Sequence, residues 1–264
     1  MDKTENINLT SITDQGRSEI EDVVVKELPL KVFLNGRELV TTLCSPVALN
    51  YLAVGILVSE GLLDSRQEIK KLSIDAKAGL VHVETIEDKQ MASGQFFKPL
   101  VASGGGKGAS SYSLPGLKHE IKVDSRFTIS SGEVSALVKD FLRCSSVYQT
   151  THGVHSAALC DNQGILLFHD DIGRHNAIDK VFGECLMNDI TLDERIIITS
   201  GRISSEILLK VAKRKIPVLI SKAAPTNLGV ELANDLGITI IRFIMDKGIN
   251  VYSHDWRVTT DGGK

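Results

Sequence analysis

Apolar and polar residues follow strand and helix patterns in turn along the first part of the chain. Apolar runs at 23–34 and 39–43 flank Asn35-Gly36, and this dipeptide between alternating runs is a strong hairpin signal. Ser45-Pro46 fits a helix start, and apolar residues recur at helical spacing over 49–57. A second hairpin is expected over 72–85. Residues 19–126 are therefore predicted to form a smaller N-terminal α+β subdomain.

Two stretches lack such a period. Residues 1–18 carry few apolar side chains, which predicts a disordered arm. Residues 88–126 are rich in Gly and Ser, and a mobile loop is expected at about 95–113. The glycine run at 103–108 has neither the spacing nor the Gly-Lys-Ser/Thr ending of a phosphate-binding loop, so we exclude that interpretation.

Regular alternation returns toward the C-terminus. Ser130 and Glu133 resemble a capping box before an amphipathic helix. Strand-like and helix-like segments then alternate, with strands at 195–199, 217–221, 238–243 and 250–253 and helices at 204–213 and 226–236. This order predicts an α/β domain over 127–264 with a mainly parallel sheet.

The loops that follow parallel strands meet at one edge of the sheet, where ligands bind. Hydroxyl-bearing helix N-termini and cations in such loops suit phosphate or pyrophosphate groups. Taken singly, each residue also fits a helix cap or a solvated cation, but their convergence favours a nucleotide-like pocket. The candidates are Gly201, Arg202, Ser204, Ser205, Ser221, Lys222, Ala224, Pro225, Thr226, Phe243, Ile244, Met245, Asp246, Lys247 and Gly248.

Residues 151–180 concentrate reactive side chains, including four of the seven histidines. A hairpin pattern that turns at 161–164 gives way here to a helical pattern, and free backbone N–H groups at such a junction favour an anion. An N-cap, hydrogen-bonded histidines and a surface cation would explain the same residues one by one. As a cluster they predict a site. Its members are His155, Asp171, Arg174, His175 and Asn176.

Composition bears on the partners and the cellular compartment of the protein. The 30 basic and 33 acidic residues give a formal charge of −3, which does not indicate a nucleic-acid partner. The four cysteines are widely spaced without a CxxC pair, which favours free thiols in a reducing cytoplasm. The longest apolar run, at 49–58, is too short to span a bilayer, so no membrane segment is expected.

Several segments together resemble a known family. They are FLNG at 33–36, LNYLAVGILVSEG at 49–61, THGVHSAAL at 151–159, DIGRHNAIDK at 171–180, SGR with SSE at 200–206, and APT at 224–226. From about residue 20 to 254 the chain is similar to the FdhD/NarQ formate dehydrogenase accessory family. The resemblance implies a cytoplasmic sulfur carrier that takes sulfur from a cysteine desulfurase. It passes this sulfur to the bis(molybdopterin guanine dinucleotide) molybdenum cofactor before formate dehydrogenase receives it. The resemblance also implies a cytidine-deaminase-like main domain and a homodimer.

One departure from the family is specific. The family carries its persulfide in a Cys-Gly-x-Cys-Gly loop, and Gly105 and Gly108 occupy both cysteine positions here. Without a thiol no persulfide forms at that place. The zinc signatures of deaminases are also missing from the sequence, so no metal site is expected.

Three hypotheses follow. The first is an accessory protein that binds the cofactor, or a GDP- or GMP-like fragment of it, without carrying sulfur through this loop. The second is a sulfurtransferase that uses another thiol, with Cys160 the nearest candidate. The third is a deaminase-fold hydrolase that uses the His/Asp cluster as acid and base.

Overall fold

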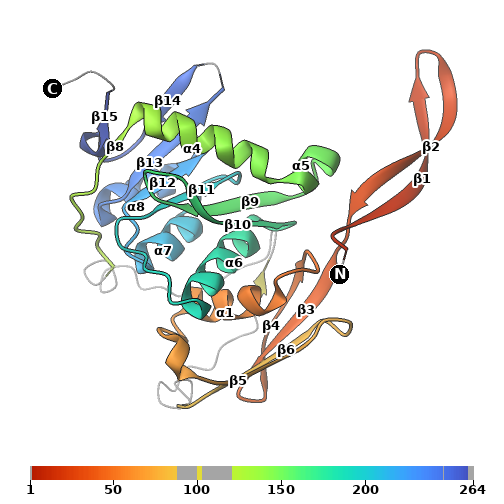
Figure 1. Ribbon diagram of the computed structural model, residues 1–264, viewed down its shortest axis with the longest axis horizontal. Helices are drawn as coiled ribbons and strands as arrows, with labels where there is room; N and C mark the ends of the chain where they lie inside the picture. The colour runs from red at the N-terminus through yellow and green to blue at the C-terminus, as the bar shows by residue number, and fades with distance from the viewer. Residues whose placement is uncertain (1, 88–99, 103–120, 246, 261–264) are drawn as a thin grey trace.

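The computed structural model describes residues 2–87, 100–102, 121–245 and 247–260 of the chain. Figure 1 shows helices packed around two larger sheets, and this mixture confirms the α/β class. The helices are α1 (Leu49–Glu60), α4 (Ser131–Cys144), α5 (Ser146–Thr151), α6 (Arg174–Met187), α7 (Ser205–Lys213) and α8 (Asn227–Leu236), with short 3-10 helices at Arg66–Glu68 and Asp255–Arg257.

A six-stranded sheet has the order β10-β9-β11-β12-β13-β14. Its strands are β9 (His155–Cys160), β10 (Ile165–Asp171), β11 (Ile196–Thr199), β12 (Val218–Ser221), β13 (Thr239–Ile244) and β14 (Gly248–Val251). β11, β12 and β13 are parallel, as the strand–helix alternation predicts. The expectation of a mainly parallel sheet is wrong, because β9 runs antiparallel to both neighbours and β14 runs antiparallel to β13. Tight turns join β9 to β10 and β13 to β14, and such turns cannot make a parallel crossover.

A five-stranded sheet has the order β5-β6-β3-β4-β7. Its strands are β3 (Leu28–Leu34), β4 (Arg37–Cys44), β5 (Ile69–Asp75), β6 (Leu80–Thr85) and β7 (Leu100–Ala102). Both predicted hairpins are present, β3–β4 and β5–β6. Asn35 and Gly36 have φ values of 50° and 81°, the left-handed pair that a tight hairpin turn requires. β8 (Ile129–Ser130) and β15 (Val258–Thr259) form a short parallel pair.

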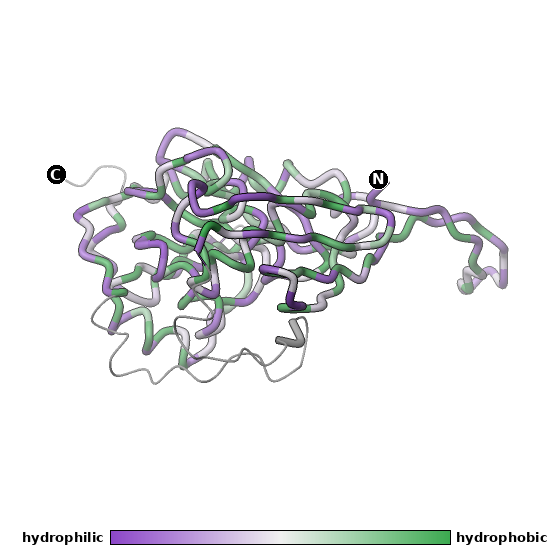
Figure 2. Tube along the Cα trace, turned by 90° about the horizontal axis from the view of Figure 1, so that it is seen from below, coloured by the Kyte–Doolittle hydropathy of each residue, from purple (hydrophilic) through white to green (hydrophobic). Residues whose placement is uncertain are grey.

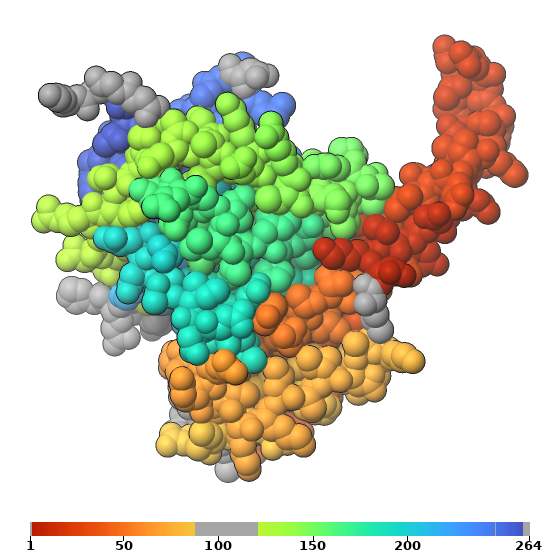
Figure 3. All heavy atoms as spheres, in the orientation of Figure 1, coloured from red at the N-terminus to blue at the C-terminus, as the bar shows by residue number. Residues whose placement is uncertain are grey.

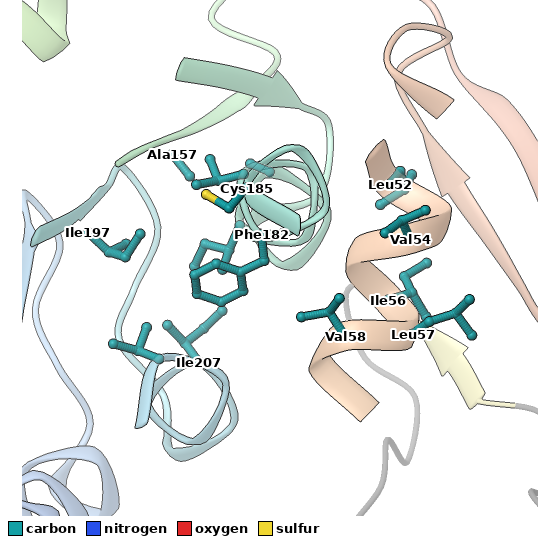
Figure 4. Packing of buried hydrophobic residues seen from close by; sticks show 14 of the residues in the cluster. Leu52, Val54, Ile56, Leu57, Val58, Ala157, Phe182, Cys185, Ile197 and Ile207 are labelled. Carbon is teal, nitrogen blue, oxygen red and sulfur yellow. The ribbon is translucent and has the colours of Figure 1, made fainter. Parts of the chain in front are cut away.

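Apolar side chains of the central strands alternate between two cores. Ile197, Leu219 and Ile240 face a large core that also contains side chains of α1, α6, α7, α8 and the five-stranded sheet. Their neighbours Ile196 and Val218 face a second core under α4. Figure 4 shows the large core, where α6 and α7 side chains gather beside α1. The two larger sheets thus share one core.

Glycines allow α1 and α6 to meet at the backbone. A Cβ atom on Gly55 would lie 1.7 Å from the Asp179 carbonyl oxygen, and one on Gly183 would lie 1.9 Å from that of Tyr51. No side chain fits at either distance. The first part of the chain is therefore packed directly on the helix that follows the histidine-rich block.

The predicted disordered arm is wrong. β1 (Thr4–Thr13) and β2 (Gly16–Val25) pair along their whole length as an antiparallel hairpin that extends from the body (Figures 1 and 3). Figure 2 shows hydrophilic and hydrophobic positions interspersed along it. Leu9 pairs with Ile20, and cross-strand pairs of this kind stabilise strands without a deep core. The prediction considered how few apolar residues this segment has and not their spacing, which places them opposite one another in the hairpin. The mobile loop expected at about 95–113 lies outside the described residues except for β7.

Candidate functional site

The ends of five strands meet at one edge of the six-stranded sheet. Thr199, Ser221 and Arg242 lie level with one another in the parallel strands, so the loops that follow them share an edge, as predicted. β9 is antiparallel and starts at this edge with His155, which pairs with Asp171 at the end of β10. The structure therefore brings the histidine-rich block to the same edge as the strand-end loops.

Arg174 lies across Gly201 at this edge. It is the first residue of α6, and a Cβ atom on Gly201 would lie 2.7 Å from the Arg174 Cβ atom. A larger residue at 201 would displace the arginine. The glycine therefore makes room for the Arg174 stem.

Positive charge at the edge is only partly offset, by the Glu206 carboxylate near Arg174. Burial, and then the positive charge of Arg202, lower the pKa of Arg174. Within the described residues neither arginine forms an ion pair with a carboxylate, and the Nε atom of Arg174 is buried without a hydrogen-bond partner. A bound anion would pair with the arginine charges and would accept a hydrogen bond from the Arg174 Nε atom.

His155 and Lys222 extend this charged region. The Nδ1 atom of His155 lies 3.2 Å from the Ser200 hydroxyl. Burial lowers the pKa of His155, and the charges of Arg174 and Lys222 lower it further. The histidine thus stays neutral beside cations. We call Arg174, Arg202, Lys222 and His155 the ligand edge.

Sequence reasoning missed two ring side chains near this edge, Tyr148 on α5 and His152 directly after that helix. Lys222 donates to the Tyr148 hydroxyl at 3.2 Å and lies 4.8 Å from the centre of its ring. His152 meets the same ring edge-on, with centroids 5.0 Å apart. No local sequence signal joins residues 148 and 222, because only the folded chain brings α5 beside the loop after β12.

Other predicted site residues have structural roles. The Ser221 hydroxyl donates to the Gly201 carbonyl at 2.8 Å and so ties two strand-end loops together. Ser204 caps α7 and Thr226 caps α8. Ser205 is the first residue of α7, while Ala224 and Pro225 lead into the α8 cap. Ser204 and Thr226 are therefore helix caps, which was the alternative interpretation of these residues in the sequence.

Asp171 and Asn176 lie inside the fold, where 0% and 2% of their surfaces are exposed. Asp171 forms a fully buried ion pair with Lys180, with Nζ and Oδ2 2.6 Å apart. The Ser45 backbone N–H donates to the same oxygen at 3.1 Å. The predicted helix start at Ser45-Pro46 is wrong, because α1 begins at Leu49 with Ala48 as its N-cap residue. We call Ser45, Asp171, Asn176 and Lys180, together with the Leu43 carbonyl group, the buried junction.

His175 lies between the two regions. Its Nε2 atom is 3.6 Å from Glu206. Burial lowers its pKa to about 3, and nearby Lys210, Arg174 and His155 contribute to the shift. His175 is therefore uncharged near neutral pH.

The third predicted loop is a hairpin turn. Phe243 and Ile244 end β13, Met245 and Lys247 are exposed, and Gly248 starts β14 with a φ of 86°. Arg242 pairs with Ser221, the last residue of β12, so β13 continues two residues further, to Ile244, before the turn. Asp246 lies outside the described residues. The role of this turn in ligand binding stays a prediction.

The four cysteines, all described, differ from an activated thiol. Cys44, Cys160 and Cys185 are buried, and burial raises the pKa of each to about 12. Cys144 is exposed, and its pKa is also raised, first by partial burial. This environment argues against Cys160 as a sulfur acceptor. Gly105 and Gly108 lie outside the described residues.

The described residues contain no group of three or more His, Cys, Asp or Glu side chains able to hold a metal ion. Asp171, which the hydrolase hypothesis needs as an acid or base, is fully buried and paired with Lys180. None of the helices in the described part of the chain has the length and apolar character needed to span a bilayer.

Comparison with known proteins gives consistent relatives. The FdhD/NarQ family model matches residues 25–259. A protein of Bacillus subtilis (strain 168) named sulfur carrier protein FdhD is 40% identical over 259 residues, covering 96% of this chain and 99% of that protein. A protein of Staphylococcus aureus (strain MRSA252) with the same name is 40% identical over 237 residues, covering 90% and 89%. The crystal structure of a formate dehydrogenase accessory protein from Desulfotalea psychrophila superposes with a TM-score of 0.79 at 25% identity, covering 97% of this chain and 100% of that one.

Proposed function

The chain belongs to the FdhD/NarQ family, and from this premise we propose that it is a formate dehydrogenase accessory protein that binds the guanine-dinucleotide molybdenum cofactor. The cofactor is its cargo, bound before delivery to the dehydrogenase. Relatives named as sulfur carriers, and a neighbour described as a formate dehydrogenase accessory protein, support the role.

The positive charge of the ligand edge, which no ion pair among the described residues balances, carries the proposal. Arg174 and Arg202 lie close enough for one to lower the pKa of the other, and neither has a carboxylate partner among the described residues. Phosphate oxygens would offset this repulsion and would accept from the buried Arg174 Nε atom. The side chains present therefore fit the phosphates of a guanine dinucleotide, or of a GDP- or GMP-like fragment.

Sulfur carriage is the second part of the proposal. In the family resemblance, Gly105 and Gly108 replace the persulfide cysteines. The remaining thiols have raised pKa values, and low-pKa thiolates are the ones that accept sulfur readily. We therefore infer that this chain binds the cofactor while the sulfur reaches it from a thiol outside the chain.

The family premise also supplies the setting of the proposal. We propose a cytoplasmic homodimer that meets a cysteine desulfurase and formate dehydrogenase. The near balance of 30 basic and 33 acidic residues supports a role without nucleic acid.

Calorimetric titration with GDP tests the binding part. The unmodified protein is expected to bind GDP more tightly than guanosine, because the phosphates supply the contacts. Equal or absent binding of the two would contradict the assignment of the ligand edge.

Intact-protein mass after incubation with a cysteine desulfurase and cysteine tests the sulfur part. The unmodified chain is expected to gain no reducible sulfur, whereas Gly105→Cys with Gly108→Cys is expected to gain some. An adduct on the unmodified chain that disappears in Cys160→Ser would instead support the second hypothesis.

A further inference from the structure

We propose that Lys180 is a positioning residue that acts through Asp171 to fix the turn before α6, and with it the Arg174 guanidinium at the ligand edge. The inference rests on the proposed function for the identity of the ligand. The junction itself is a property of the fold.

The Lys180 side chain is fully buried together with its partner. Its Nζ atom lies 2.6 Å from the Asp171 Oδ2 atom and also donates to the carbonyl oxygens of Asp170 at 3.2 Å and Ser45 at 3.5 Å. Burying two charges is costly, and an apolar side chain fills a core position without that cost. A buried lysine with three oxygen partners is therefore expected where a geometry has to be maintained.

Asp171 distributes this constraint over the turn. Its Oδ1 atom accepts from the Gly173 backbone N–H and from the Asn176 side chain, both at 2.9 Å. Asn176 also donates to the Leu43 carbonyl at 2.8 Å, and the Ile172 N–H donates to the Ser45 hydroxyl at 3.2 Å. The turn is thus bonded to the end of β4 from both sides.

Arg174 follows this turn directly. Its stem packs on Gly201, so its position depends on the junction behind it and on the loop after β11 in front of it. Charge-assisted contacts to an anion depend steeply on distance and direction. A turn released from Lys180 would leave Arg174 on the same chain segment but in a wider range of positions.

Lys210 provides a matched control. It forms a similar pair with Asp179, with Nζ and Oδ2 2.6 Å apart, and Asp179 lies on the same helix as Lys180. This pair joins α7 to α6 and has no hydrogen bond to the turn at 171–173. Lys210→Met therefore removes a mostly buried ion pair while leaving the junction intact.

Hydrogen exchange tests the positioning without any ligand. In Lys180→Met, the amides of 43–45 and 172–176 are expected to lose protection together, whereas in Lys210→Met they keep it. Unchanged protection in Lys180→Met, or equal loss in both variants, would overturn the proposal.

GDP titration supplies the second measurement. Lys180→Met is expected to weaken GDP binding tenfold or more at a temperature where it is folded, and Lys210→Met to stay within twofold of the unmodified protein. Wild-type affinity in Lys180→Met would overturn the positioning role. If the unmodified protein does not bind GDP, the proposed function fails, while the exchange result still decides the role of Lys180. Should Lys180→Met not fold, Asp171→Asn with Lys180→Met, which leaves no unpaired charge, replaces it in both measurements with the same expected results.

Discussion

The buried junction and the ligand edge take residues from one block of sequence but treat charge in opposite ways. In the junction, the Asp171 carboxylate has four donors and the Lys180 ammonium group has three oxygen acceptors. At the ligand edge, Arg174 and Arg202 have no carboxylate partner among the described residues. The first region is complete without a ligand, and the second is not. Proximity in sequence to a site therefore does not mean contact with its ligand.

The largest effect is expected from breaking the junction. Asp171→Ala leaves the Lys180 charge buried without its partner, which should lower the free energy of unfolding by about 3 to 5 kcal/mol. Urea unfolding measures this loss. A change below about 1 kcal/mol would mean that water reaches Lys180 and that the two regions do not differ as described.

Removing cations from the ligand edge should weaken ligand binding and leave stability nearly unchanged. Arg202→Ala and Lys222→Ala are each expected to weaken GDP binding by about 1.5 to 3 kcal/mol, or roughly 10- to 150-fold, with little change in stability. Both side chains are exposed, so their loss leaves no cavity. Arg143→Ala and Lys139→Ala, exposed cations on α4, are the controls and should bind GDP normally. Equal losses in all four variants would point to net charge instead of a site.

His175, between the regions, should make stability depend on pH. Its pKa is about 3 in the folded protein, against about 6.5 in an unfolded chain. Above the unfolded value its contribution is fully present. As the pH falls from about 6.5 toward 3, only the unfolded chain takes up the proton, so stability falls by up to about 1.4 kcal/mol per pH unit. Urea unfolding of the unmodified protein and His175→Gln should diverge on acidification; parallel curves would contradict the burial of a neutral ring.

The smallest effect concerns a hydroxyl near the edge that does not belong to the binding group. Thr226 accepts from the Gly229 N–H at 3.1 Å as the cap of α8. Thr226→Ala should cost about 1 kcal/mol of stability and leave GDP affinity unchanged, while Thr226→Ser should keep both. A loss of affinity at full stability would move this residue into the ligand edge.

Local signals predicted much of the fold. Asn35-Gly36 marked the β3–β4 turn, the Ser130/Glu133 capping box starts α4, and β11 to β13 alternate with α7 and α8. The mixed sheet did not follow, because strand direction at its margins depends on turns at both ends of the sheet. The β1–β2 hairpin was missed because its apolar residues are few, although they lie on matching positions.

The site was predictable in part. The edge shared by three loops followed from the parallel strands, and the histidine-rich block was recognised as special. The sequence alone could not distinguish residues that hold the fold from residues that contact the ligand. Asp171, Asn176 and Arg174 stand within six positions of one another, yet only contacts with distant Ser45 and Leu43 show that the first two face inward. The contacting residues are more than 120 positions apart in the sequence, and no periodic pattern of apolar and polar residues predicts such a contact.

The glycine contacts between α1 and α6 determine how the chain comes apart. Backbone atoms of the two helices touch at Gly55 and Gly183, and both larger sheets border the same core. Neither the early nor the late portion of the chain could close its apolar surface alone, so heating should give one cooperative transition instead of two. Pieces made separately by cutting the gene between the two sheets should remain insoluble, and mixing them during synthesis should be the way to recover a native protein.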